Sequence, residues 1–152
     1  MNDLINARCG WAGTDELYVK YHDEEWGVPV HDDRRLFEML ILEGFQAGLS
    51  WECVLNKQEA FRRAFDDFDW DKVSAYDEAR QAALYADPGI IRNRRKIAAA
   101  VGNAAVFSAI RQEFGSFDSY LWQWTGGKTL VERGPTTSPL SDAISKDLKK
   151  RG

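Results

Sequence analysis

The sequence predicts an all-α domain. Apolar residues recur at helical spacing, and polar residues that favour helix N-caps precede the apolar runs. No stretch shows the alternation of apolar and polar residues that is typical of a half-buried strand. The chain has 152 residues, enough for one domain that buries a core without disulfides. No repeat or long linker interrupts it. We therefore predict a single domain over residues 1–152, built from about eight short helices.

The first half of the chain contains two predicted core helices. One ends near Gly48, and Ser50 is the predicted N-cap of the next. Asp69 and Asp77 are predicted to cap two short helices that follow. The apolar face of the first core helix comprises Leu36, Met39, Leu40, Glu43 and Ala47, and that of the second comprises Trp51, Val54, Leu55, Phe61 and Phe65.

The sequence of the second half of the chain predicts one long helix, a shorter helix, a loop and a terminal helix. Asn93 caps the long helix and Gly115 ends it. Ser116 begins the shorter helix, residues 125–137 form an irregular loop, and Ser138-Pro139 begins the last helix in the preferred order of a capping hydroxyl followed by proline. One side of the long helix is predicted to carry Ile97, Ala100, Val101, Ala104, Phe107 and Phe114.

Charge and composition limit the classes of function. A net charge of −4 argues against a protein that coats DNA through phosphate neutralisation alone. Basic residues nevertheless cluster within 92–96 and 146–151, where they form either a local DNA-docking face or ordinary solvated helix surfaces. The two cysteines do not form a secreted disulfide framework, and the sequence shows no export signal or membrane span. We expect a cytoplasmic monomer with no membrane partner.

Aromatic residues surround one carboxylate in the N-terminal third of the sequence. Trp and Tyr rings suit a planar ligand, above all a cationic one. The carboxylate is Glu43, and an inward-facing carboxylate needs a partner. Two structural alternatives stand beside this interpretation: the rings are ordinary core residues, and Glu43 pairs with an arginine or caps a neighbouring helix. The aromatic residues are Trp11, Tyr18, Tyr21, Trp26 and Trp51.

Two helix starts are candidate phosphate contacts. In the turn at 87–91, Gly89 is free to take a positive φ and to bring backbone amides towards a ligand. The alternative is an ordinary connection between helices. At the last helix, Thr136, Thr137, Ser138 and Ser141 offer hydroxyl and backbone donors, which serve N-capping equally well.

These motifs resemble the bacterial 3-methyladenine DNA glycosylase I family, which belongs to the helix-hairpin-helix glycosylases. The resemblance rests on Tyr-His-Asp-x-Glu-Trp-Gly-Val-Pro at 21–29, Glu-Gly-x-Gln-Ala-Gly-Leu-Ser-Trp at 43–51, Asp-Pro-Gly-Ile-Ile-Arg-Asn-Arg-Arg-Lys-Ile at 87–97, Gly-Asn-Ala at 102–104, and the Pro-Thr-Thr-Ser and Ser-Asp-Ala strings at 135–143. It extends over nearly the whole chain, from Cys9 to Gly152.

The resemblance implies an activity and roles for the pocket residues. The activity is hydrolysis of the N-glycosidic bond of N3-methyladenine in alkylated duplex DNA, leaving an abasic site without strand cleavage. Glu43 is implied to accept a hydrogen bond from the exocyclic amino group of the base. Tyr21 and Trp51 are implied to stack on it with Trp11 beside them, and Tyr18 and Trp26 are expected to form the pocket wall.

The resemblance also implies how DNA is held. The turn becomes the hairpin of a helix-hairpin-helix element that grips the DNA backbone, and the start of the last helix provides a second contact. Related glycosylases usually place an aspartate near the target sugar, and the resemblance implies that this branch lacks it. The available carboxylates Asp87 and Asp118 we interpret as turn and first-turn helix residues. The implied DNA contacts are Gly89, Ile90, Arg92, Arg94, Lys96, Thr137 and Ser138.

A structural zinc site is implied only in part. Cys9 and His22 match two family ligands, whereas Cys53 and His31 do not fit the pattern. The family's other two ligands lie in a C-terminal segment after the equivalent of Gly152, so we expect a chain shortened relative to the family. Phe45 also departs from the pattern and is expected to alter the pocket wall.

Two other functions remain open at this point. One is a non-catalytic helical module that binds damaged DNA or a protein partner through its aromatic surface. The other is a truncated, inactive glycosylase.

Overall fold

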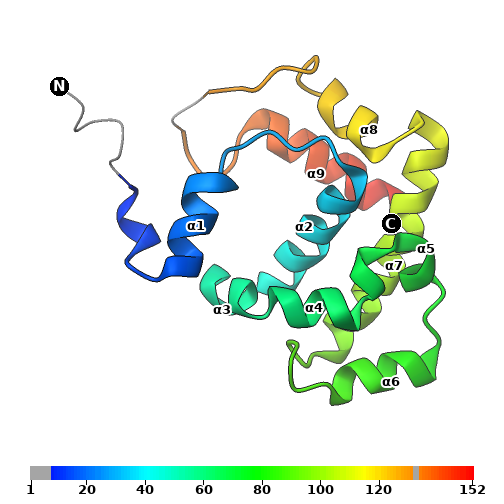
Figure 1. The fold of residues 1–152 in the computed structure, drawn as a ribbon. Coiled ribbons are helices and arrows are strands. Elements are labelled where there is room, and N and C mark those ends of the chain that lie inside the picture. Colours follow the sequence, from blue (N-terminus) through cyan, green and yellow to red (C-terminus); the bar gives the residue numbers. More distant parts are fainter. Residues whose placement is uncertain (1–7, 132–133) are drawn as a thin grey trace.

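The computed structural model describes residues 8–131 and 134–152, and this part of the chain contains helices and no strand, which confirms the all-α prediction (Figure 1). No helix in these residues is long and apolar enough to cross a membrane. The elements are η1 Gly10–Ala12, α1 Glu16–Glu24, α2 Asp33–Gln46, α3 Trp51–Asn56, α4 Gln58–Ala64, η2 Asp66–Phe68, α5 Trp70–Ser74, α6 Glu78–Ala86, α7 Arg94–Phe114, α8 Phe117–Gln123 and α9 Pro139–Arg151.

Side-chain caps begin most of these helices. Each of the six caps predicted from the sequence accepts a hydrogen bond from a backbone N–H of the first turn, and each such cap stabilises its helix by about 1 kcal/mol. Helix α1, which sequence periodicity did not predict, is capped in the same way by Asp15. Gly115 ends α7 with a φ of 86°, as predicted. The confirmed caps are Ser50, Asp69, Asp77, Asn93, Ser116 and Ser138.

The hydrophobic core lies around α7, which packs against α2, α5, α6 and α8. Phenylalanines dominate this core, for example Phe107 stacked on Phe117 with ring centroids 4.4 Å apart. The prediction that Phe45 alters the pocket wall is wrong. Its side chain is 1% exposed and packs in the core against Phe61, at a centroid distance of 4.8 Å.

The predicted apolar stripe of α2 is only partly correct: Leu36, Met39 and Leu40 are partly buried against the core, but Glu43 and Ala47 are exposed. The fully buried residues include Phe37, Ile41 and Phe45, whereas Glu43 is exposed. Residues 36–42 are apolar at nearly every position, so periodicity alone could not locate the buried face. The predicted helix after Ser50 is also divided, because the backbone leaves helical geometry at Lys57 and separates α3 from α4.

Helices α6 and α7 pack against each other and are joined by a hairpin at residues 87–93. Gly89 does not use its freedom to take a positive φ, since it is not among the glycines with left-handed backbone. A glycine is required here instead because there is too little room for a side chain. A Cβ at this position would lie 3.0 Å from Asp87 Oδ1 and 3.1 Å from the Ala60 Cβ. Asp87 accepts the Gly89 N–H at 2.7 Å, which confirms its role as a turn residue.

Candidate functional site

Five predicted aromatic residues come together where α1 contacts η1 and α3, and these helices lie at one edge of the molecule in Figure 1. The ring of Trp11 lies 5.3 Å from that of Tyr18 and 5.2 Å from that of Trp26. Tyr21 links this group to α3, with its centroid 5.5 Å from that of Trp51. The structure therefore joins residues that are up to forty positions apart in sequence. We call this group the aromatic cluster.

The residues of the aromatic cluster differ in solvent exposure, with one buried ring and two exposed ones. Trp51 is 8% exposed, whereas Trp11 and Trp26 are 41% and 51% exposed. Large apolar side chains that remain this accessible in a group are typical of binding surfaces. The alternative of ordinary core packing thus fits Trp51 and does not fit Trp11 or Trp26.

Glu43 lies on the last turn of α2 and its charge acts on the aromatic cluster. Burial, followed by the negative charges of Glu43 and Glu25, raises the pKa of the Tyr21 hydroxyl. Partial loss of hydration also raises the pKa of Glu43 itself, although part of the side chain remains accessible. No hydrogen bond or salt bridge ties Glu43 to another residue in the described part of the chain. The alternative of a structural arginine pair is therefore not observed at Glu43.

The buried carboxylate on α2 that has partners is Glu38, not Glu43. Glu38 is 6% exposed and accepts from Arg62 Nε at 2.7 Å and from Gln58 Nε2 at 2.9 Å. The sequence interpretation missed this cluster, although an acidic residue among apolar ones at 36–42 was a signal for it. Glu38 is neutralised by its neighbours, whereas Glu43 is left to interact with a ligand.

Polar groups in the aromatic cluster complement Glu43. With a raised pKa, Tyr21 keeps its proton at neutral pH and its hydroxyl can donate a hydrogen bond. The indole N–H of Trp51 is buried and has no acceptor among the described residues. An unsatisfied buried donor costs about 1–3 kcal/mol, which a ligand acceptor can offset. The arrangement offers flat faces, donors and one carboxylate acceptor.

The basic residues predicted to contact DNA differ in their surroundings. Arg92 and Arg94 are exposed, and the Arg94 guanidinium lies 4.1 Å from the centroid of the Tyr85 ring. Lys96 instead donates to the backbone carbonyl oxygens of Phe45 at 2.8 Å and Ala47 at 2.6 Å. It thereby neutralises the C-terminal end of α2, as a cation at a helix end does.

The other predicted contacts lie in the hairpin and at α9. Ile90 is 2% exposed and belongs to the core, so a contact there must come from its backbone. Gly89 lies beside it in the hairpin. Ser138 and Ser141 form a reciprocal capping box at the start of α9, and Thr137 immediately precedes it. The capping interpretation is confirmed, and the DNA contacts stay predictions.

Cys9 and His22 are neighbours, as a shared metal would require. The Cys9 backbone N–H donates to His22 Nε2 at 3.3 Å, and His22 Nδ1 lies 2.9 Å from Asp23 Oδ1. A carboxylate on the far ring nitrogen is the usual second partner of a metal-binding histidine. In residues 8–131 and 134–152, however, no group of three or more His, Cys, Asp or Glu side chains could hold a metal ion. These residues alone do not fit a complete zinc site.

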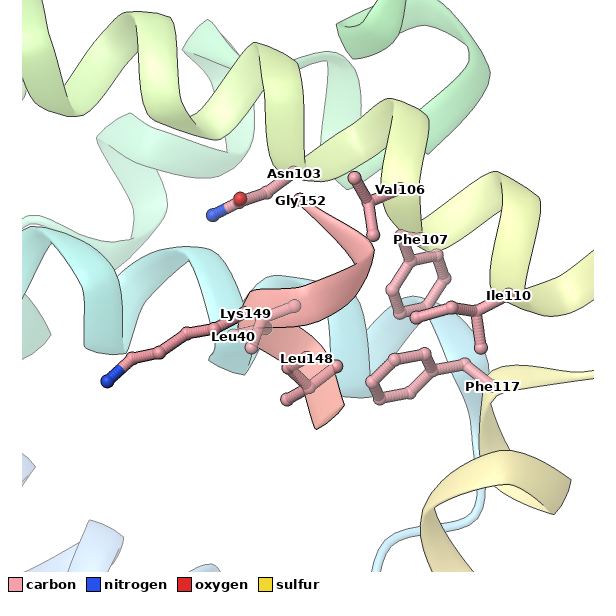
Figure 2. A pocket seen from close by; sticks show the side chains of 9 residues that line it. All are labelled: Leu40, Asn103, Val106, Phe107, Ile110, Phe117, Leu148, Lys149 and Gly152. Carbon is pink, nitrogen blue, oxygen red and sulfur yellow. The ribbon is translucent and has the colours of Figure 1, made fainter. Parts of the chain in front are cut away.

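A cavity of about 270 Å³ lies away from the aromatic cluster, where the last turn of α9 meets α2 and α7. Figure 2 shows Leu40, Val106, Phe107 and Leu148 around it, with Lys149 at its side. None of the predicted pocket residues lines it. It is a packing feature of α9 in this fold and is separate from the candidate site.

The fold and the site define a class of protein: an all-helical domain with a partly exposed cluster of aromatic rings next to a carboxylate. Comparison with known proteins identifies the family. Residues 11–152 match the family model described as methyladenine glycosylase. The chain belongs to this family, the methyladenine glycosylases.

Individual relatives are similar over most of their length. A DNA-3-methyladenine glycosylase 1 from Escherichia coli (strain K12) is 46% identical, over 95% of this chain and 81% of that protein. A crystal structure of a 3-methyladenine DNA glycosylase I is 45% identical with a TM-score of 0.91, covering 96% of this chain and 84% of the other. A Staphylococcus aureus 3-methyladenine DNA glycosylase I, solved to explain 3-methyladenine recognition, is 36% identical with a TM-score of 0.89, covering 95% and 80%.

Proposed function

We propose that this protein hydrolyses the N-glycosidic bond of N3-methyladenine in alkylated duplex DNA and leaves an abasic site. Family membership supports this function, and so do relatives that are named for acting on 3-methyladenine. One observation carries it for this chain. Glu43 has no partner of its own in the described residues and lies beside the aromatic cluster, where its charge reaches Tyr21.

The chemistry of the lesion matches this site. Adenine methylated at N3 is cationic, so the bond to the sugar is already weakened and the base leaves without further protonation. The protein must take the nucleotide out of the stack, hold the ring and allow water to attack a sugar with oxocarbenium character. Cation–π attraction of about 2 kcal/mol in a desolvated site distinguishes the lesion from neutral adenine. Glu43 accepts from the exocyclic amino group, which adenine has at the position where guanine has a carbonyl.

Strand cleavage after treatment with alkali tests the activity. Methylated duplex DNA incubated with the protein should break only after alkali, because hydrolysis of the glycosidic bond leaves an intact backbone with an abasic site. Breakage without alkali would mean that a lyase step follows, and no breakage in either condition would contradict the proposed activity.

We propose that the hairpin between α6 and α7 docks the DNA backbone. Its support is the exposed pair Arg92 and Arg94 at the start of α7. The Gly89 N–H is bonded to Asp87 and the Ser138 N–H to Ser141, so further phosphate contacts would come from the amides next to Gly89 and from Thr137 beside Ser138. Phosphate contacts set the position on the duplex without reading its sequence, as a protein that searches for lesions requires.

Replacing Arg92 and Arg94 by glutamine should weaken DNA binding and reduce its salt dependence. Each lost phosphate contact lowers the slope of log K against log salt by about 1, so the double variant should lose about 2. Fluorescence anisotropy with an undamaged duplex at several salt concentrations measures this. Lys72→Gln, which removes one positive charge on α5, outside both basic groups, is the control. An equal loss of slope per charge removed in the control would show that overall charge, and not the hairpin, governs binding.

We further propose Cys9 and His22 as two ligands of a structural zinc site. The support is their contact and the carboxylate of Asp23 on the far side of the imidazole. The remaining ligands would have to come from outside the described residues, and the proposed base release does not depend on the metal.

A further inference from the structure

Helix α1 holds much of the aromatic cluster, yet it is weakly attached to the rest of the domain. None of its residues is fully buried. Its main contacts within the domain are with η1 and α3, where Tyr21 meets Trp51. A helix attached along one side can rotate about that contact, so a second anchor is needed to fix Tyr21.

A cavity lies behind Tyr21 on the side that faces α2. It has a volume of about 450 Å³ and separates the end of α1 from α2 and α4. Tyr21 and Trp26 line one wall, and Arg35, Met39 and Arg62 line the opposite wall. Because side chains do not fill this space, fewer van der Waals contacts hold the end of α1 against α2 there.

One ion pair bridges the two walls. Glu25 follows α1 directly, and its backbone N–H donates to the Tyr21 carbonyl oxygen at 2.9 Å, closing the last turn. Its carboxylate accepts a hydrogen bond from Arg35 Nη2. Glu25 is therefore tied both to the backbone of Tyr21 and to helix α2.

The α2 side of this bridge is itself rigidly held. Arg35 Nη1 lies 2.9 Å from Glu38 Oε2, and the buried Glu38 also accepts from Arg62 and Gln58 on α4. Removing a partner from a buried carboxylate is strongly destabilising, so this group stays in place. It fixes the guanidinium of Arg35 at the edge of the cavity.

We propose that Glu25 and Arg35 are positioning residues, whose ion pair across the cavity holds the last turn of α1 and keeps Tyr21 in place in the base site. This inference rests on the proposed function for its consequence in base binding. Neither residue needs to touch the base. The pair acts on base binding through Tyr21. Glu38, with its partners Arg62 and Gln58, holds Arg35 in position for this ion pair.

Glu25→Gln tests the inference, and Glu59→Gln is a matched control. The Glu59→Gln substitution also removes one ion pair from the group around Glu38, because Glu59 Oε1 lies 2.6 Å from Arg62 Nη1. Glu59 makes no hydrogen bond or ion pair with α1 in the described residues. We expect Glu25→Gln to weaken binding of free 3-methyladenine on the order of tenfold, because small displacements of a binding group cause losses of this size. Glu59→Gln should bind as the wild type does. Quenching of tryptophan fluorescence measures the affinity.

A second measurement makes the result independent of base binding. In protein labelled with ¹³C-tyrosine, the ring signals of Tyr21 should shift or broaden in Glu25→Gln and stay in place in Glu59→Gln. Unchanged Tyr21 signals in Glu25→Gln, or equal changes in both variants, would overturn the inference. If the wild type binds no 3-methyladenine at all, the proposed function fails, while the tyrosine signals still decide whether the ion pair positions Tyr21.

Discussion

Replacing Glu43 by glutamine is expected to slow release of N3-methyladenine by about 10- to 100-fold. A hydrogen bond to a charged group contributes about 1.5–3 kcal/mol, and each 1.4 kcal/mol corresponds to about a factor of ten in rate. Glutamine keeps an acceptor oxygen and the shape of the side chain but removes the negative charge beside a cationic ring. Single-turnover release from methylated duplex DNA, with enzyme in excess, measures the effect.

The stability of the same variant separates a binding role from a structural one. Partial loss of hydration raises the pKa of Glu43 in the folded protein, so the folded state holds this proton more tightly than the unfolded chain does. The favourable contribution of this group to the free energy of unfolding is present at low pH and is lost as the pH rises through the raised pKa. The glutamine variant avoids this loss. Its melting temperature should equal or slightly exceed that of the wild type at neutral pH, and any excess should vanish in acid. A clearly lower melting temperature would indicate a structural carboxylate instead.

Replacing Tyr21 by leucine is expected to reduce kcat/KM for N3-methyladenine by about 30-fold. The substitution keeps an apolar side chain of moderate size but removes the aromatic face, and with it a cation–π interaction of about 2 kcal/mol. The ring of Tyr21 packs against that of Trp51, so the loss acts within the aromatic cluster. Steady-state release of the methylated base measures it.

Tyr21→Phe is the matched control for this prediction. It keeps the aromatic face and removes only the hydroxyl, a donor whose raised pKa keeps it protonated at neutral pH. The phenylalanine variant should lose less than the leucine variant, by about the value of one hydrogen bond. If both variants lose activity equally, the hydroxyl and not the ring face makes the main contribution.

Local signals in the sequence predicted the helices well. A capping side chain and its first-turn N–H are close in sequence, so Asp69, Asp77, Asn93 and Ser138 could be recognised without knowing the fold. Helix α1 also carried such a signal in Asp15, together with the three-residue spacing of Tyr18 and Tyr21. The gathering of the aromatic cluster was expected from motifs, and the structure confirms that these residues meet.

Features that depend on tertiary packing could not be predicted in this way. The exposure of Glu43 and the burial of Glu38 are set by which face of α2 meets α7, and an almost continuous apolar run does not reveal that face. Gly89 is explained by the approach of Ala60 from another helix, not by its own φ. The pair of Glu25 and Arg35 crosses a cavity between helices, and no local spacing indicates it.

Identification of the bases released from methylated duplex DNA tests the central claim most directly. Chromatography of the supernatant separates N3-methyladenine from N7-methylguanine, which is also cationic but has a carbonyl where Glu43 would accept from an amino group. We predict that the wild type releases N3-methyladenine and leaves N7-methylguanine in the DNA, and that Glu43→Gln releases far less. Release of both bases, or of neither by the folded wild type, would contradict the assignment of this site.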